Sequence, residues 1–218
     1  MNQNQSIYLS RALLRNWNDI GPVTPELPDT ISPFISSIEV LAHYAAGQPH
    51  TALDLIRRTW GYMLNSPLMT GSTLIEGMSA NGSLAYRSTR SYNYDSAYTS
   101  LSHSWSTGPT QALSFKAVGL EIVGWKRWVF RPQPGDLKNL RTSYVSPMGQ
   151  YEAKVQLGEP KGASGRTIKA TLATPNETTG TIVLPFQCKL VTVDGRIYSE
   201  DELVHGSGVT HVIGHGCE

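Results

Sequence analysis

The sequence is poor in several features that define whole classes of proteins. Only two of its 218 residues are cysteine, Cys188 and Cys217, which is too few for a disulfide framework. The sequence does not decide whether the two cysteines form a disulfide bridge or remain free thiols. No apolar run reaches the roughly eighteen residues of a transmembrane helix. Charged residues make up 16% of the chain and leave a net charge of +1, which gives little support for binding to nucleic acid or to a membrane surface.

What remains is the composition of a globular protein. The length fits one or two domains that can bury a sizeable core, and apolar residues form 39% of the chain. The first residues, up to Trp17, carry Arg11 and Arg15 within their apolar segment and show no small-residue cleavage site. We therefore expect no signal peptide in this sequence.

Apolar residues recur at helical spacing in the first third of the chain. Three helices are predicted there, over residues 7–17, 33–46 and 53–64. Ser32 and Pro33 supply an N-cap and a first helical residue for the second helix, and Gly47 ends it. The short turn containing Pro49 predicts that the second and third helices form an antiparallel hairpin.

Residues 66–104 lack sustained periodicity and are rich in Ser, Thr, Gly, Asn and Tyr. A connection of this length is usually functional or disordered. Four tyrosines favour an ordered functional loop, namely Tyr86, Tyr92, Tyr94 and Tyr98. A fourth helix is predicted to follow from Thr107 to about Leu120.

After Gly124 the pattern changes to a period of two residues, as in β-strands. Further short strands are predicted at residues 142–146, 150–157, 166–173, 180–184 and 188–193. Closely spaced strands with turn signals between them predict a small antiparallel β-sandwich over residues 123–200. Residues 201–218 are rich in Gly, and we expect them to form an exposed tail.

Several blocks of sequence, taken in order, resemble a known family. They are Trp60–Leu64, Thr70–Gly77, Ser102–Thr110, and Pro132–Leu137 followed by Ser146–Tyr151. Together they resemble the C-terminal part of the α-L-rhamnosidases of glycoside hydrolase family 78, particularly the fungal relatives, over about residues 30–195. The resemblance implies an α + β multidomain chain. Residues 1–122 would be the last helical hairpins of an (α/α)6 toroid, the six-hairpin glycosidase domain, followed by the β-sandwich.

The same resemblance implies an activity and a set of site residues. Family members hydrolyse terminal α-L-rhamnose from glycosides with inversion, and Glu76 takes the position of their general base. His103 matches the family histidine in the sugar pocket, and Trp105, in the same motif, is grouped with it as substrate-binding. Carboxylates alone can perform this chemistry, so no metal or organic cofactor is implied. Relatives are commonly secreted, but the sequence itself indicates no compartment.

The residues allow plainer interpretations when the family is set aside. Glu76 stands among apolar neighbours, which suits acid–base chemistry, but most loop glutamates are simply solvated. His103 would then be a hydrogen-bonded histidine at the start of a helix. Trp60 and Trp105 would belong to the helical core, because both lie beside helical apolar residues.

The second catalytic carboxyl group is not identified. Twelve helices with their loops need on the order of 200 residues, and only about 121 precede the predicted sandwich. In the family the general acid comes from earlier hairpins. None of the carboxylates before residue 66 lies in a motif that matches it, namely Asp19, Glu26, Asp29, Glu39 and Asp54. The alternative function is a catalytically incomplete carbohydrate-binding or assembly module.

Incomplete helical packing also has a physical consequence. The inner faces of two hairpins normally pack against neighbouring hairpins, and large exposed apolar patches are unusual on soluble monomers. We therefore expect one of three cases: the chain self-associates, it binds another polypeptide that supplies the missing hairpins, or it is a nonfunctional gene fragment.

Other chemistries find less support. The last residues contain His205, His211, His215 and Cys217, residue types that bind zinc, but their spacing matches no familiar zinc motif. No Gly-x-Ser-x-Gly segment indicates a serine hydrolase. We predict no metal site.

Overall fold

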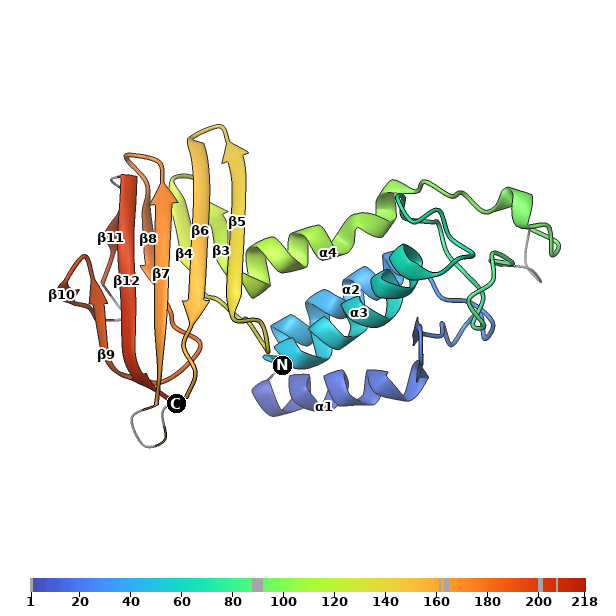
Figure 1. Ribbon diagram of the computed structural model, residues 1–218, viewed down its shortest axis with the longest axis horizontal. Coiled ribbons are helices and arrows are strands. Elements are labelled where there is room, and N and C mark those ends of the chain that lie inside the picture. Colours follow the sequence, from blue (N-terminus) through green and yellow to red (C-terminus); the bar gives the residue numbers. More distant parts are fainter. Residues whose placement is uncertain (1, 88–91, 161, 163–164, 200–201, 207) are drawn as a thin grey trace. The chain divides into compact units, whose positions relative to one another are not determined.

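The computed structural model describes residues 2–87, 92–160, 162, 165–199, 202–206 and 208–218. The chain divides into two compact units, Met1–Ala112 and Leu113–Glu218. The first is mainly helical and the second is built from β-strands, so the chain is of the α + β type (Figure 1). Within the described residues, no helix is both long enough and apolar enough to cross a membrane.

Three α-helices open the first unit, as predicted: α1 (Gln3–Leu13), α2 (Pro33–Ala45) and α3 (Pro49–Asn65). A capping box starts α1, because Asn2 and Gln5 exchange side-chain and backbone hydrogen bonds. Gly47, with φ of +68°, follows α2 in the left-handed conformation that ends many helices. Pro49 is the first residue of α3 rather than part of the turn, and α2 and α3 pack as a hairpin (Figure 1).

The long segment between α3 and the next α-helix contains little regular structure. Short 3-10 turns lie at Ser96–Tyr98 and Ser104–Thr107, and two short strands, β1 (Trp17–Asn18) and β2 (Gly21–Pro22), pair earlier in the chain. An isolated bridge joins Ile31 to Met78, so the stretch of chain just before α2 anchors the segment. The irregular connection predicted from composition is therefore ordered where it is described.

The fourth predicted helix ends earlier than expected. It consists of α4 (Gly108–Gln111) and a π-helical segment over Ala112–Ala117, and Leu120 already begins a strand. Gly119 ends the helical stretch with φ of +87°. A Cβ atom at Gly119 would lie 2.3 Å from the backbone of Arg131, so only glycine fits this close approach.

Two sheets make up the second unit. One has six strands in the order β10-β9-β12-β7-β6-β5, and the other has four in the order β11-β8-β4-β3. The strands are β3 (Leu120–Gly124), β4 (Arg127–Phe130), β5 (Asn139–Ser146), β6 (Gly149–Leu157), β7 (Arg166–Thr174), β8 (Thr179–Ile182), β9 (Cys188–Val193), β10 (Arg196–Ile197), β11 (Val204–His205) and β12 (Gly208–Cys217). The prediction of a purely antiparallel arrangement was wrong at one place, because β4 and β8 pair in parallel.

Residues 201–218 do not form the exposed tail that we expected. Strand β12 lies between β7 and β9 in the six-stranded sheet (Figure 1). Its side chains alternate, with Thr210 and Val212 buried and His211 and His215 exposed. Frequent glycines hide this alternation in the sequence, and the strand is held by hydrogen bonds to partners on both sides.

The two cysteines form one disulfide, which decides between the two options left open by the sequence. Cys188 of β9 lies opposite Cys217 of β12, so the bridge joins neighbouring strands across 29 residues of sequence. The cysteine of the candidate zinc group is thus already bonded. Across the described residues, no group of three His, Cys, Asp or Glu side chains is placed to hold a metal ion.

The core of the second unit lies between its two sheets. Strand β4 contributes Trp128 and Phe130, and the six-stranded sheet contributes Tyr151 and Leu172, all fully buried. Hydrogen bonds also cross between the layers, as from the hydroxyl of Tyr144 to the carbonyl oxygen of Leu120 at 3.0 Å. Alternation along the strands therefore places apolar side chains inside and polar ones outside.

Candidate functional site

Backbone hydrogen bonds bring together two loop segments that contain the predicted site residues. The amide of Glu76 donates to the carbonyl oxygen of Ser100 at 2.8 Å, and the amide of His103 donates to that of Leu74 at 2.8 Å. Ser106 adds a side-chain bond of 2.6 Å to the carbonyl oxygen of Ile75. The two motifs that flank the long loop are thus held side by side.

The Glu76 side chain is buried, with 5% of the residue exposed. The hydroxyl of Tyr92 donates to Oε1 at 2.7 Å, and the amide of Ser100 donates to Oε2 at 3.2 Å. Both oxygens of the carboxylate therefore have a protein donor, as burial of a charged group requires. This is not the environment of an ordinary solvated loop glutamate.

Trp105 and His103 lie next to this glutamate. The indole nitrogen of Trp105 donates to the main-chain oxygen of Glu76 at 3.1 Å, and the ring of His103 lies 4.2 Å from that of Trp105. His103 occupies the N-cap position of a 3-10 turn, yet its side chain makes no capping hydrogen bond. The structure thus places the three predicted site residues together.

The two tryptophans have different environments. Trp60 is buried and donates to the carbonyl oxygen of Ser106 at 2.7 Å, which confirms its expected place in the core. Trp105 is 39% exposed, so the expectation that it also belongs to the core was wrong. It contacts the exposed ring of Phe34 at a centroid distance of 5.5 Å. An aromatic surface is therefore open to solvent beside Glu76.

A tyrosine cluster contacts the Glu76 carboxylate through Tyr92. The ring of Tyr92 contacts those of Tyr86 and Tyr98 at 6.0 Å and 5.9 Å. Burial raises the pKa of Tyr86, and the hydrogen bond to Glu76 raises the pKa of Tyr92. The sequence indicated an ordered loop from these tyrosines, but no spacing signal identified Tyr92 as the partner of Glu76.

Several other carboxylates of the first unit have structural roles. Glu39 accepts a hydrogen bond from the indole nitrogen of Trp17 at 2.6 Å, and Asp54 pairs with Arg58 at 3.1 Å. Asp95 caps the 3-10 turn at Ser96–Tyr98. The contacts of these groups therefore do not assign any of them as the second catalytic carboxyl group.

A buried polar chain joins α1 to α2. Ser10 Oγ lies 2.7 Å from His43 Nδ1, and His43 Nε2 lies 3.3 Å from Glu39 Oε1. These residue types resemble a serine hydrolase triad, but Ser10 and His43 are fully or almost fully buried. Both side chains lie within the packing of the two helices, so the chain of hydrogen bonds holds α1 and α2 together.

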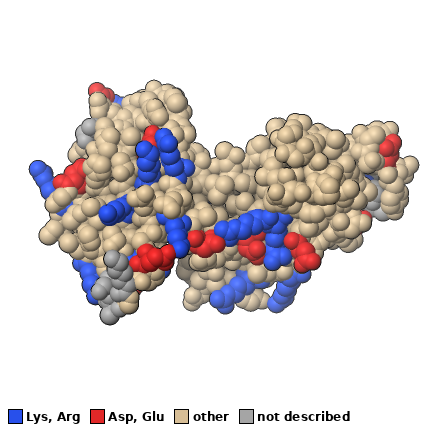
Figure 2. Space-filling view, in the orientation of Figure 1, with Lys and Arg blue, Asp and Glu red and all other residues tan. Residues whose placement is uncertain are grey.

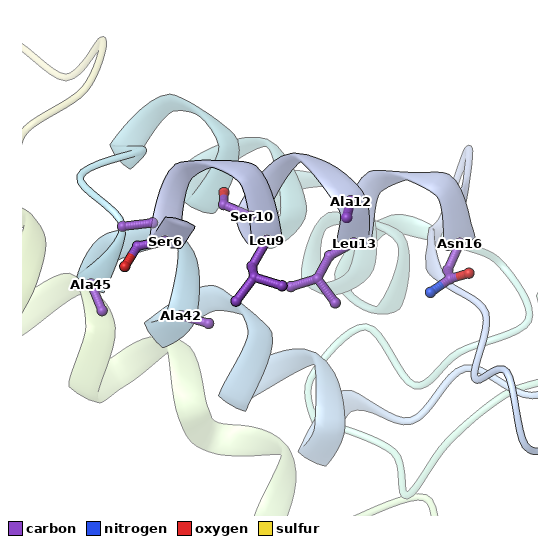
Figure 3. A pocket seen from close by; sticks show the side chains of 9 residues that line it. Ser6, Leu9, Ser10, Ala12, Leu13, Asn16, Ala42 and Ala45 are labelled. Atoms are coloured by element: carbon purple, nitrogen blue, oxygen red, sulfur yellow. The ribbon is translucent and has the colours of Figure 1, made fainter. Parts of the chain in front are cut away.

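An apolar groove of about 490 Å³ runs between α1 and α2 (Figure 3). Small and aliphatic side chains dominate its lining, including Leu9, Leu13, Ala42 and Ala45. The outer face of α2 continues the apolar surface with exposed Ile35 and Ile38. This groove offers packing surface but no acid–base chemistry.

Charge gives no indication of a polyanionic ligand. On the face shown in Figure 2, blue and red side chains are interspersed and most of the surface of each unit is uncharged. This agrees with the net charge of +1. A broad basic surface, as nucleic acid requires, is not seen on that face.

Comparisons with known proteins find similarity to parts of α-L-rhamnosidases. Residues 119–196 match the model of the bacterial alpha-L-rhamnosidase C-terminal domain. No curated protein matches the chain. The structure resembles the alfa-L-rhamnosidase from Aspergillus terreus, with a TM-score of 0.65 and 20% identity, over 97% of this chain and 21% of that one.

Two further solved structures are similar. The alpha-L-rhamnosidase from Dictyoglumus thermophilum has a TM-score of 0.60 and 16% identity, over 84% of this chain and 21% of that one. The Streptomyces avermitilis alpha-L-rhamnosidase complexed with L-rhamnose has a TM-score of 0.58 and 18% identity, over 82% and 17%. This chain thus spans about a fifth of the length of these proteins. It shares the fold of part of known α-L-rhamnosidases, and residues 119–196 match the model of their C-terminal domain.

Proposed function

We propose that this chain is the C-terminal part of an inverting α-L-rhamnosidase of glycoside hydrolase family 78, of the fungal type, with Glu76 as the general base. One observation carries the proposal. The buried Glu76 carboxylate is held by two donors within the loops that also present His103 and the exposed indole of Trp105. The shared fold and the match of residues 119–196 support it.

The contacts of Glu76 suit a general base. A carboxylate has about four lone-pair sites, and Tyr92 and Ser100 occupy one on each oxygen. The remaining acceptor sites can bind a water molecule and take its proton as it attacks the anomeric carbon. In an inverting hydrolase a second carboxyl group protonates the leaving oxygen.

His103 and Trp105 supply the sugar-binding surface in this proposal. The exposed ring of Trp105 can stack on the apolar face of a sugar, and a ring nitrogen of His103 can hydrogen-bond to a hydroxyl group. Because the two rings are 4.2 Å apart, one bound monosaccharide can contact both. The substrate class is therefore a rhamnose-containing glycoside.

The general acid belongs, in this proposal, to further helical hairpins of an (α/α)6 toroid. The polypeptide that carries them would also cover the groove between α1 and α2. Exposed apolar side chains on α2, among them Phe34, Ile35 and Ile38, support this because contiguous apolar patches mark interaction surfaces. The solved rhamnosidases contain about five times the length of chain present here.

A second function is favoured by the contacts of the other carboxylates. Since Glu39, Asp54 and Asp95 already serve the local structure, the chain by itself would be a catalytically incomplete carbohydrate-binding or assembly module. Such a module would bind rhamnose at Trp105 and His103 without cleaving a glycosidic bond. The two functions differ in whether a second carboxyl group reaches the sugar.

Hydrolysis of 4-nitrophenyl α-L-rhamnoside by the purified chain tests the proposal, because this leaving group departs with little help from a general acid. We expect Glu76→Gln to lower the rate at least about 100-fold, because general-base catalysis contributes roughly that much. Proton NMR of the first product should show β-L-rhamnose, as inversion of an α-glycoside requires. Glu26→Gln is a matched control, because Glu26 is an exposed carboxylate in the same unit.

Equal rates for Glu76→Gln and the unmodified chain would contradict the proposed base. A folded chain that binds L-rhamnose but does not cleave the aryl glycoside would support the module instead. In that case the loss of binding in Trp105→Ala, measured by calorimetry, would locate the sugar. A folded chain with neither turnover nor binding would contradict both functions.

A further inference from the structure

We propose that Tyr92 is the residue that positions the Glu76 carboxylate for reaction, an inference that rests on the proposed role of Glu76 as the general base. The hydroxyl of Tyr92 donates to Oε1 at 2.7 Å while the amide of Ser100 donates to Oε2 at 3.2 Å. One donor on each oxygen fixes the rotation of the carboxylate plane. The lone pairs left for water then point in a set direction.

The position of Tyr92 is itself fixed by its neighbours. Its ring lies edge-on to that of Tyr86, at an interplanar angle of 70°, and contacts Tyr98 on another side. The guanidinium group of Arg87 lies 5.9 Å from the centre of the Tyr92 ring. A phenol held in this way directs its hydroxyl group at Glu76 with little rotational freedom.

The position of Tyr86 depends on a glycine next to the proposed base. A Cβ atom at Gly77 would lie 2.3 Å from the ring of Tyr86, so the ring packs directly on the backbone beside Glu76. Tyr86 is buried and supports Tyr92 from that place. The residue after the proposed base thus takes part in positioning it, through Tyr86 and Tyr92.

The hydrogen bond to Glu76 favours the protonated form of the Tyr92 phenol, which is the form that can donate. The groups that act on Tyr92 are the Glu76 carboxylate, the Arg87 guanidinium and the Tyr86 hydroxyl. The hydrogen bond to Glu76 is the largest influence and raises the pKa of Tyr92. Tyr92 therefore remains a neutral donor across the range in which a glycosidase works.

The contact can be measured without any turnover. The chain has ten tyrosines, and NMR of ring-labelled tyrosine follows the ionisation of each one; Tyr92→Phe assigns the signal. We expect Tyr92 to titrate above the usual tyrosine pKa, and to return toward that value in Glu76→Gln. The same titration midpoint in both proteins would overturn the proposal.

Kinetics then separate positioning from a merely structural role. Tyr92→Phe keeps the ring contacts and removes one hydrogen bond to a charged group, so kcat should fall about 10-fold. KM should stay within about twofold, since the sugar contacts are elsewhere. Tyr94→Phe is the control, because Tyr94 is an exposed tyrosine of the same loop outside the cluster of Tyr86, Tyr92 and Tyr98.

The outcomes distinguish this proposal from the proposed function. An unchanged kcat in Tyr92→Phe, in a chain that loses activity in Glu76→Gln, would overturn the positioning role and leave the base role intact. If kcat falls and the melting temperature of Tyr92→Phe also drops strongly, the lower activity reflects loss of folded protein, and the positioning role is overturned. If the unmodified chain shows no turnover, the catalytic role of Glu76 in this chain fails, and the titration alone decides the contact.

Discussion

Elements of the two units differ in how much apolar surface they leave exposed. In the β unit, strands such as β6 and β7 place apolar residues inside and polar or charged residues outside. In the helical unit, α2 buries Ser36, Ser37 and His43 while it exposes Phe34, Ile35 and Ile38. Strands β6 and β7 therefore bury their apolar faces, whereas α2 has apolar surface left over.

Local hydrogen bonds compensate the cost of burying the polar side chains of α2. Ser36 Oγ donates to the carbonyl oxygen of Ser32 at 2.9 Å, and Ser37 Oγ donates to that of Pro33 at 2.7 Å. Gly108 packs against Ser37 so closely that a Cβ atom would lie 2.1 Å from it. Small side chains on α2 thus allow close approach, and they stabilise the unit less through apolar burial than larger side chains would.

Removal of core volume in the β unit should have the largest effect on stability. Leu172 is fully buried on β7, opposite Ala153 and Thr210 on the neighbouring strands. We expect Leu172→Ala to lower the free energy of unfolding by about 2–5 kcal/mol. Hydrogen exchange of the β6, β7 and β12 amides measures this within the unit itself. A loss below about 1 kcal/mol would contradict the view that this core is closely packed.

Alkaline pH should weaken the β unit by a smaller amount. Burial raises the pKa of Tyr144 and Tyr151, which lie stacked with ring centres 5.5 Å apart. A raised pKa in the folded state favours the protonated phenol, so this stability is present below about pH 10, the unfolded value, and is lost as pH rises through the folded value.

Tyr144→Phe tests this dependence. The variant loses the hydrogen bond to Leu120, so it should be somewhat less stable near neutral pH, but its unfolding free energy should fall less steeply above pH 10. Urea titrations at several pH values give both quantities. Parallel declines for the two proteins would show that the ionisation of Tyr144 is not linked to folding.

The sequence predicted those elements that local patterns define, and it missed pairings between residues that are far apart in sequence. Strands β6 and β7 have a clear period of two and turn signals at their ends, so their limits were predicted closely. Strand β12 was missed because Gly208, Gly214 and Gly216 interrupt its alternation and its partners lie far away in sequence. The parallel pairing of β4 with β8 crosses about fifty residues and has no local signal.

The site shows the same limit. The resemblance grouped Glu76, His103 and Trp105 in one site, and the folded chain brings these three residues together although their spacing gives no signal for such contacts. The hydrogen bond from Tyr92 to Glu76 spans 16 residues of aperiodic loop, and only the folded chain shows it. The exposure of Trp105 was likewise missed, although its neighbours in the 3-10 turn, Ser104 and Ser106, are polar.

The smallest effect on stability is expected for a substitution on the outer face of α2. This substitution tests whether the apolar surface of α2 is left unpacked by its own unit. Ile38 is 54% exposed, so Ile38→Ser should change the free energy of unfolding by no more than about 0.5 kcal/mol. The same change removes apolar surface from the face that we propose is covered by further helical polypeptide, and it should therefore reduce self-association in sedimentation velocity. Val145→Ser is a matched control, because Val145 is an exposed β-branched residue on edge strand β5.

If Ile38→Ser lowers stability by several kcal/mol, α2 is already packed by its own unit and the contrast fails. If stability is unchanged and the unmodified chain is a monomer, a second copy does not cover this face, and the further helices remain as its partner.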